Sequence, residues 1–267
     1  IFRRQAITPV YIQGDSFHRY SRTQMAAAIQ SMQDQGRTIS HFGPGGNLFD
    51  QLEALFREYA ETGRGWRRLY LHNAEEVAEY GGSVAEGEFT PWEPLPDGTD
   101  VLFYEGLHGG IVTAEYDVAQ YVDFLVGVTP IVNLEWIQKI HRDAGARGYT
   151  PEDTVETIKR RMDDYVEYIT PQFSRTDINF QRVPLVDTSN PFVASEVPSA
   201  DESLVVIRVG EATRSHMDFP YLLAMIQGAF MARPNTLVIP GGKLGFAMEL
   251  ILTPFIERLS RGERIRE

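Results

Sequence analysis

Short apolar runs alternate with helical patterns along almost the whole of this chain. The runs have the length and composition of buried strands, and they occupy residues 10–12, 69–71, 101–104, 124–132, 183–186, 204–209 and 237–239. Apolar residues at helical spacing predict helices between most of them, at 48–59, 133–143, 150–169, 219–232 and 243–259. Strands that alternate with helices pack as a sheet covered by helical layers. The order therefore predicts an α/β fold with a largely parallel central sheet.

Two of the predicted helices begin with recognisable residues. Asn47 is placed to cap the helix over 48–59, because its side chain can accept from free backbone N–H groups. Thr150 is the cap of the helix that follows it, with a proline and acids in the first turn. Residues 78–99 are rich in acids, glycine and proline, and we interpret them as an excursion rather than a boundary. We therefore expect one domain over residues 1–267.

Charge and composition exclude several classes of protein. The 267 residues carry a net charge of −12, which opposes binding to nucleic acid or to anionic membranes. No apolar run approaches the roughly 18 residues that a membrane span needs, so we expect no membrane partner. The chain has no cysteine, which excludes disulfides and cysteine metal sites within it. An anionic substrate would therefore need a local basic cluster against an acidic background.

Two carboxylates stand at the predicted carboxyl ends of strands. Asp15 follows an apolar run in the stretch GDSFHRYSR, and Glu105 ends the run VLFYEG. In open α/β sheets, ligands bind at the carboxyl ends of strands. A lone acid there often only caps a loop, but two at neighbouring strand ends suit Mg²⁺ binding together with a general base for a hydroxyl. The groups that follow Asp15 favour phosphate: His18, Arg19 and Arg22.

The helix over 133–143 carries a charged face. Lys139, Arg142 and Asp143 share that face by i, i+3 and i+4 spacing. The structural interpretation is a solvated face with an internal ion pair. The functional interpretation adds Arg147, which glycines flank as in a mobile lid. A basic lid that closes over phosphates stabilises the charge that develops in phosphoryl transfer.

Two further features are ambiguous or negative. Tyr70 and His72 face the same way on a predicted strand, where they could hold a sugar or could be half-buried and structural. The glycine-rich stretch 42–47 precedes a helix, as a phosphate loop would. It lacks the Gly-Lys-Ser/Thr ending of such a loop, and no convincing strand leads into it. We interpret it as a turn.

Long segments of the chain resemble phosphoribulokinases of the proteobacterial type. The resemblance extends over nearly the whole chain and is densest in GDSFHRYSR, LFYEGLHGG, VNLEWIQKIHRDAGARGYT, TPQFSRTDINFQRVPLVDTSNPF and ADESLVVIR. It implies a three-layer P-loop kinase fold, with a mixed sheet flanked by helices. It also implies a cytoplasmic kinase of the Calvin cycle, which transfers a phosphoryl group from ATP to the C1 hydroxyl of D-ribulose 5-phosphate. The products are ribulose 1,5-bisphosphate and ADP.

The resemblance further implies roles for the residues above. Asp15 takes the proton of the C1 hydroxyl, and Glu105 is associated with Mg²⁺ together with Asp15. Lys139 is the partner of the transferring phosphoryl group. The other catalytic or lid positions are Arg142, Asp143 and Arg147, of which the arginines steady substrate phosphates. The remaining contacts to the sugar phosphate are His18, Arg22, Tyr70 and His72.

Regulation and assembly are implied by the resemblance alone. Bacterial members are typically homo-oligomers activated by NADH, and the arginines that align with that regulation are Arg4, Arg208 and Arg233. The cysteine pair that thioredoxin switches in the plant enzymes is impossible in a chain without cysteine. The family begins with a strand and a phosphate-binding loop, whereas these residues begin in what looks like the tail of the next helix. We therefore expect the first strand and the P-loop to be absent from the 267 residues, which by themselves would make a poor kinase.

Two alternatives remain open. A related P-loop kinase with another acceptor, such as a uridine kinase-like enzyme, would differ in acceptor selectivity. A non-catalytic regulatory subunit could have kept the fold and lost the nucleotide loop. The presence of Asp15, Glu105 and Lys139 speaks against the second alternative, because a binding module has little need of all three.

Overall fold

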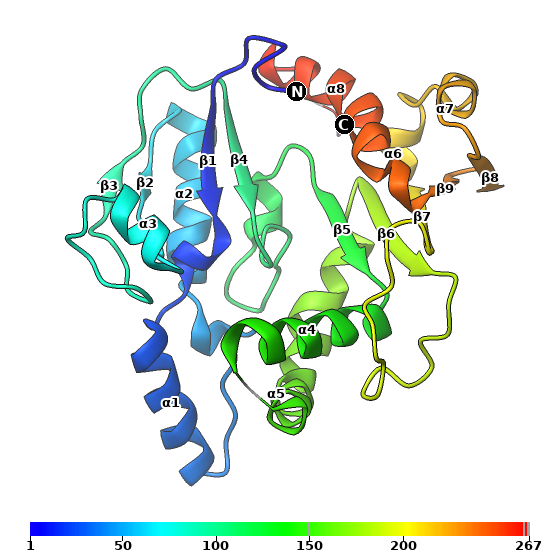
Figure 1. The fold of residues 1–267 in the computed structure, drawn as a ribbon. Helices are drawn as coiled ribbons and strands as arrows, with labels where there is room; N and C mark the ends of the chain where they lie inside the picture. Colours follow the sequence, from blue (N-terminus) through cyan, green and yellow to red (C-terminus); the bar gives the residue numbers. More distant parts are fainter. Residues whose placement is uncertain (149, 264, 266–267) are drawn as a thin grey trace. The chain divides into compact units, whose positions relative to one another are not determined.

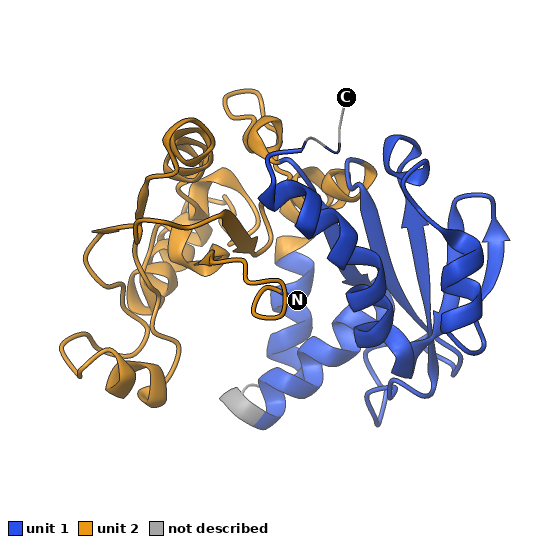
Figure 2. Ribbon diagram, turned by 90° about the horizontal axis from the view of Figure 1, so that it is seen from above, with its two compact units in different colours: residues 1, 123–160, 175–267 blue, residues 2–122, 161–174 orange. Residues whose placement is uncertain are grey.

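The computed structural model describes residues 1–148, 150–263 and 265, with residues 146 and 147 described by their backbone alone. The chain divides into two compact units, which Figure 2 colours separately. The first, here called the N-terminal unit, comprises residues 2–122 and 161–174. The second, the C-terminal unit, comprises residues 1, 123–160 and 175–267. The expectations of a single domain and of a missing first strand and P-loop stay predictions.

The N-terminal unit contains a two-stranded parallel sheet. Its strands are β1 (Pro9–Gln13) and β4 (Val101–Glu105), which Figure 1 shows side by side. Val10 and Ile12 of β1 are buried and pack in one apolar cluster with residues of α2 (Phe49–Thr62). In the register of the pair, Gln13 stands opposite Glu105. The two strands therefore end together at one edge of the sheet.

The remaining helices and strands of this unit are short or peripheral. They are α1 (Arg22–Asp34), β2 (Trp66–Arg67), α3 (Ala74–Glu79) and β3 (Glu93–Pro94). The strand predicted at 69–71 is wrong, because β2 ends before it and Tyr70 forms an isolated bridge with Phe89. Pro91 lies in the opposing segment, and a proline has no N–H with which to extend a ladder.

The C-terminal unit is built on a five-stranded sheet in the order β5-β6-β7-β9-β8. The strands are β5 (Val126–Pro130), β6 (Ile178–Pro184), β7 (Ser203–Val209), β8 (Phe230–Arg233) and β9 (Thr236–Pro240). β5 and β6 are parallel, whereas the other neighbours are antiparallel. The prediction of a largely parallel sheet is wrong, and the mixed sheet that the resemblance implies is confirmed. The described segment 185–202 holds no crossover helix, so β7 returns antiparallel to β6.

The other helices begin close to the predicted positions, apart from α6, which was not predicted. They are α4 (Val132–Arg147), α5 (Pro151–Asp164), α6 (Glu211–Arg214), α7 (Phe219–Met225) and α8 (Leu244–Ser260). The helix predicted at 219–232 ends at Met225, because Gly228 takes a φ of +84° and leads into β8. The predicted cap Asn47 is wrong, since Leu48 is the N-cap of α2. The amide of Asn47 instead donates hydrogen bonds to the turn that precedes it.

Apolar residues of α8 complete the core of the C-terminal unit. Ile251 and Phe255 of α8 are buried in one cluster with Ile207 and Leu237 of the sheet. Burial of side chains of this size contributes about 1.5–3 kcal/mol each. Within the described part of the chain, no helix has the length and apolar character to cross a membrane.

Candidate active site

Two glycines bring the ends of β1 and β4 together. A Cβ atom on Gly14 would lie 2.8 Å from the Cα of Gly106 and 2.6 Å from the hydroxyl oxygen of Tyr104. A Cβ on Gly106 would lie 2.7 Å from the Cα of Gly14. No side chain fits at either position without moving the backbone. The stretches that the sequence singled out, GDS and YEG, therefore place Asp15 and Glu105 on adjacent strand ends.

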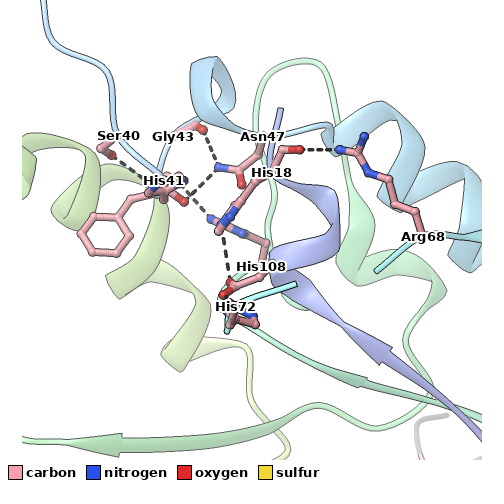
Figure 3. Close-up of polar contacts among 10 residues, drawn as sticks. His18, Ser40, His41, Gly43, Asn47, Arg68, His72 and His108 are labelled. Carbon is pink, nitrogen blue, oxygen red and sulfur yellow. Dashed lines mark hydrogen bonds and ion pairs between the residues drawn. The ribbon is translucent and has the colours of Figure 1, made fainter. Parts of the chain in front are cut away.

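Asp15 faces two imidazoles, one on each carboxylate oxygen. Oδ1 lies 3.5 Å from Nε2 of His18, and Oδ2 lies 3.6 Å from Nε2 of His72. Both histidines are labelled in Figure 3. The side chain of Asp15 is 44% exposed, so a substrate can reach it. The ring of Tyr70 stands edge-on to the ring of His72, with centroids 4.8 Å apart. The structure thus brings together four of the residues that the sequence placed in one site.

His18 is held in its neutral form. Burial, together with the nearby His108, His72, Arg161 and Arg68, lowers the pKa of His18 to about 3. A neutral imidazole can donate one N–H to a carboxylate without adding a positive charge beside it. His18 therefore faces Asp15, at 3.5 Å, as a neutral ring at neutral pH.

Two histidines that the sequence analysis missed lie behind His18. The ring of His41 is 4.2 Å from the ring of His18, centroid to centroid. Burial and the neighbouring His18 lower the pKa of His41 to about 3, and burial lowers the pKa of His108 to about 4. Nε2 of His108 lies 3.0 Å from the carbonyl oxygen of Phe42. The three imidazoles come from segments far apart in the sequence, so no local spacing pointed to them.

Arg68 anchors the turn that carries Asp15. Its guanidinium donates to the carbonyl oxygen of Ser16 at 2.9 Å and to that of His18 at 2.6 Å. The guanidinium also stacks 3.6 Å above the ring of Phe89, which is a favourable cation–π arrangement. Burial lowers the pKa of Arg68 to about 10, which still leaves the side chain charged at neutral pH.

Arg22 begins α1 at the border of this site. It donates to Oε1 of Glu86 at 2.6 Å and to the carbonyl oxygen of His72 at 2.9 Å. Its side chain is 53% exposed, so it is accessible to an anionic ligand. Glu105 is also exposed and accepts from the hydroxyl of Tyr11 at 3.3 Å. The N-terminal unit thus places a cation and a second carboxylate near Asp15.

The charged face of α4 forms as the spacing predicts. Nζ of Lys139 lies 2.5 Å from Oδ2 of Asp143, and Nε of Arg142 lies 3.6 Å from Oδ1 of the same carboxylate. Asp143 is 6% exposed, whereas Arg142 is 60% exposed. Arg147 is the last residue of α4, and its side chain falls outside the described residues.

The arginines associated with regulation fall into different units. Arg208 of β7 and Arg233 of β8 both stand opposite Thr236 of β9 in the sheet register. Arg208 donates to the hydroxyl of Thr176 at 2.9 Å. Arg4 lies in a turn of the N-terminal unit. The structure therefore brings two of the three arginines to one end of the sheet.

The strand-end carboxylates have the chemistry that Mg²⁺ requires. No cluster of three or more His, Asp or Glu side chains that could hold a metal ion occurs among the described residues. Mg²⁺ does not need such a cage, because it is usually held by one or two carboxylates together with substrate phosphates and water. The exposed oxygens of Asp15 and Glu105 fit that pattern.

Comparison with known proteins identifies the family. Residues 1–189 match the model of the phosphoribulokinase / uridine kinase family. This chain belongs to that family. A probable phosphoribulokinase of Escherichia coli is 55% identical over 99% of the chain and 90% of its own length. The plasmid-encoded phosphoribulokinase of Cupriavidus necator is 57% identical over 97% of the chain and 88% of its own length.

A solved structure agrees with this membership of the phosphoribulokinase / uridine kinase family. The phosphoribulokinase of Rhodobacter spheroides matches with a TM-score of 0.90 and 50% sequence identity. The match covers 98% of this chain and 90% of that protein. The family membership and the α/β kinase fold with a mixed sheet, both implied by the resemblance, are therefore confirmed.

Proposed function

We propose that this protein is a phosphoribulokinase, which transfers the terminal phosphoryl group of ATP to the C1 hydroxyl of D-ribulose 5-phosphate. The products are ribulose 1,5-bisphosphate and ADP, as in the Calvin cycle. The observation that carries the proposal is the accessible Asp15 at a strand end, with an imidazole on each oxygen and Glu105 on the adjacent strand. The relatives named phosphoribulokinase, at 55% and 57% identity, favour this acceptor over uridine.

Asp15 is the general base in this proposal. It takes the proton of the C1 hydroxyl as the oxygen attacks the phosphorus, which suits a carboxylate within reach of solvent and substrate. His18 and His72 fix the direction of the carboxylate. Positioning of this kind supplies much of the acceleration in phosphoryl transfer, because the protein does little covalent chemistry itself.

The acceptor is held by groups of the N-terminal unit. Arg22 offers a guanidinium to the 5-phosphate, because a planar cation with several donors suits phosphate oxygens. Tyr70 presents its O–H group to the sugar hydroxyls, and His18 and His72 contact the sugar phosphate through their rings. Arg147 joins them as a phosphate contact on the strength of the resemblance.

The cations of α4 stabilise the transferring phosphoryl group in this proposal. Lys139 carries the charge that meets the phosphoryl oxygens, and Arg142 steadies substrate phosphates. Asp143 is buried and holds the ammonium of Lys139 at 2.5 Å, which fixes its direction. Its role is therefore to orient a catalytic cation.

Mg²⁺, an effector and the assembly complete the proposal. Glu105, with Asp15, would hold Mg²⁺, which neutralises phosphate charge when it is bound. Activation by NADH is proposed to involve Arg4, Arg208 and Arg233. A homo-oligomer in the cytoplasm is proposed from the resemblance.

An acceptor panel tests the proposal. The full gene product is supplied with Mg·ATP and, separately, with D-ribulose 5-phosphate and with uridine, and ADP release is measured. We expect ADP release with D-ribulose 5-phosphate that is lost in Asp15→Asn. Activity with uridine alone would support the related-kinase alternative. A folded protein that is inert with both acceptors would support the regulatory-subunit alternative.

A further inference from the structure

The segment from Ser40 to Asn47 is fastened at several points, as Figure 3 shows. Oγ of Ser40 donates to Oδ2 of Asp164 at 2.6 Å and accepts from the backbone N–H of Phe42 at 3.0 Å. Nε2 of His108 meets the carbonyl oxygen of Phe42 at 3.0 Å. The backbone on either side of residue 41 is therefore fixed by side chains from two other segments.

Asn47 completes this anchoring from the other end of the turn. Its amide donates to the carbonyl oxygens of His41 at 2.9 Å and of Gly43 at 2.7 Å. The side chain is 1% exposed, so these hydrogen bonds are shielded from water. A turn that is held by hydrogen bonds at both ends keeps the residue at its apex in one place.

The side chain of His41, which this turn presents, packs against the ring of His18 in a tilted arrangement. The His41 and His18 rings are 4.2 Å apart with an interplanar angle of 37°. Nδ1 of His41 is buried and has no hydrogen-bond partner among the described residues. Nδ1 therefore contributes no hydrogen bond that would hold either ring, and the ring contact with His18 is the interaction on which the inference is based.

His18 has few ways to turn within these surroundings. Its carbonyl oxygen is bound by Arg68 at 2.6 Å, and its Nε2 faces Asp15 at 3.5 Å. The edge of Tyr70 stands 6.4 Å away, centroid to centroid, across a T-shaped contact. Without the ring of His41, the imidazole of His18 could rotate away from Asp15.

We propose that His41 is a positioning residue for the phosphoryl acceptor. Its ring packs against the ring of His18 and prevents His18 from rotating away from Asp15. The inference rests on the proposed function, in which His18 contacts the acceptor and orients the base. His41 is not among the residues proposed to contact the acceptor or to take its proton. Its effect on the reaction therefore passes through His18.

A pair of substitutions separates the ring face from the ring nitrogens. His41→Ala removes the ring that packs against His18. It is expected to lower kcat/KM for D-ribulose 5-phosphate by about ten- to hundredfold, with KM for ATP unchanged. His41→Phe keeps a flat ring and is expected to recover most of that loss, to within about threefold of the unmodified protein. His216→Ala, at an exposed position, is the matched control. Failure of the phenylalanine variant to recover activity while it stays folded would overturn the proposal.

A double variant tests whether the effect passes through His18. In a His18→Ala background, His41→Ala is expected to cost less than about a further twofold, because the side chain that it positions is already gone. An equal and additive loss in that background would mean that His41 acts on its own, and the proposal would be wrong.

A chemical probe makes the test independent of kinase activity. Diethyl pyrocarbonate modifies accessible neutral imidazoles, and peptide mass spectrometry reports the rate at His18. We expect His41→Ala to raise that rate by about tenfold or more, whereas His41→Phe leaves it low. An unchanged rate of His18 modification in His41→Ala would mean that His41 does not hold His18 in place, and the proposal would be wrong. If His41→Ala raised the rate of His18 modification but the unmodified protein had no activity on D-ribulose 5-phosphate, the positioning of His18 by His41 would be supported and the proposed function would be wrong.

Discussion

Asp15 and Asp143 are two carboxylates in opposite surroundings. Asp15 is 44% exposed and is oriented by the imidazoles of His18 and His72. Asp143 is 6% exposed and lies beside the cations of Lys139 and Arg142. Each carboxylate is described within its own unit of the chain. The neighbours differ in charge at His18, whose pKa of about 3 keeps it neutral, whereas Asp143 lies beside two basic side chains.

This difference separates two kinds of work. A cation beside a carboxylate stabilises the anion and makes it a weaker base, whereas a neutral hydrogen-bond donor has the same effect to a smaller extent. The depressed pKa of His18, about 3, keeps its ring a neutral donor. On α4, the buried carboxylate of Asp143 lies 2.5 Å from the ammonium of Lys139 and holds it in place. One region suits proton transfer and the other suits charge stabilisation.

The largest effect is expected from Asp15→Asn. The amide has the shape of the carboxylate but cannot take a proton at neutral pH, so kcat should fall by about 10²–10⁴-fold. Because Asp15 is half exposed, the midpoint of urea unfolding should stay unchanged. ADP release and urea titrations provide the two measurements.

The matched control for this variant is Asp34→Asn, at the exposed end of α1. Asp34→Asn should leave kcat and the midpoint of urea unfolding unchanged. If Asp15→Asn kept kcat within about tenfold, the general base would have to be sought elsewhere and the comparison with Asp143 would lose its meaning.

Lys139→Met should affect both activity and stability. Loss of the cation should lower kcat by about 10²-fold or more. It also removes a charge from beside the buried Asp143, so the free energy of unfolding should fall by about 1–3 kcal/mol. Urea unfolding and steady-state kinetics measure the two effects on the same preparation.

Lys159→Met is the control, because Lys159 pairs with Glu156 at 3.0 Å on the exposed face of α5. A surface pair of that kind contributes about 0–1 kcal/mol. Loss of stability with full activity in Lys139→Met would assign the α4 pair to folding alone.

The strand-end carboxylates could be found from the sequence because the information is local. An apolar run fixes the strand, the acid stands where the run ends, and the adjoining glycine marks a tight passage. The structure places Asp15 and Glu105 at the ends of two adjacent strands for that reason. The charged face of α4 followed from helical spacing in the same way.

The histidine cluster could not be found because its members meet only in the folded chain. His18, His41 and His108 lie in three segments, and no spacing relates them. Asn47 was expected to cap a helix, but its amide is bound to the turn before it. The sheet of the C-terminal unit was expected to be largely parallel, because apolar runs do not reveal strand direction.

Burial of neutral histidines should make stability fall in acid. The pKa of His108 is about 4 in the folded protein, against 6.5 for an ordinary histidine. As the pH falls below 6.5, the unfolded chain takes up a proton that the folded protein refuses until about pH 4. The stability that the neutral ring provides is therefore present above pH 6.5 and is lost on acidification. His108 alone should lower the free energy of unfolding by about 2 kcal/mol between pH 7 and pH 5.

His108→Gln tests this linkage without removing a possible donor to the carbonyl oxygen of Phe42. Its free energy of unfolding, from urea titrations at the two pH values, should depend on pH less steeply by about the 2 kcal/mol that His108 contributes. His216→Gln, at an exposed position, should retain the original pH dependence. An unchanged slope in His108→Gln would mean that the ring is not excluded from water as the structure implies.

The smallest effect is expected at Glu86, the exposed partner of Arg22. Both side chains are about half exposed, unlike Lys139 and Asp143, so their pair should contribute at most about 1 kcal/mol to stability. In the proposed function the acceptor phosphate competes with Glu86 for the guanidinium of Arg22. Glu86→Gln should therefore lower KM for D-ribulose 5-phosphate by about two- to fivefold and leave kcat unchanged. A rise in KM would mean that Glu86 orients Arg22 as Asp143 orients Lys139. The two ion pairs would then differ in their burial but not in their role.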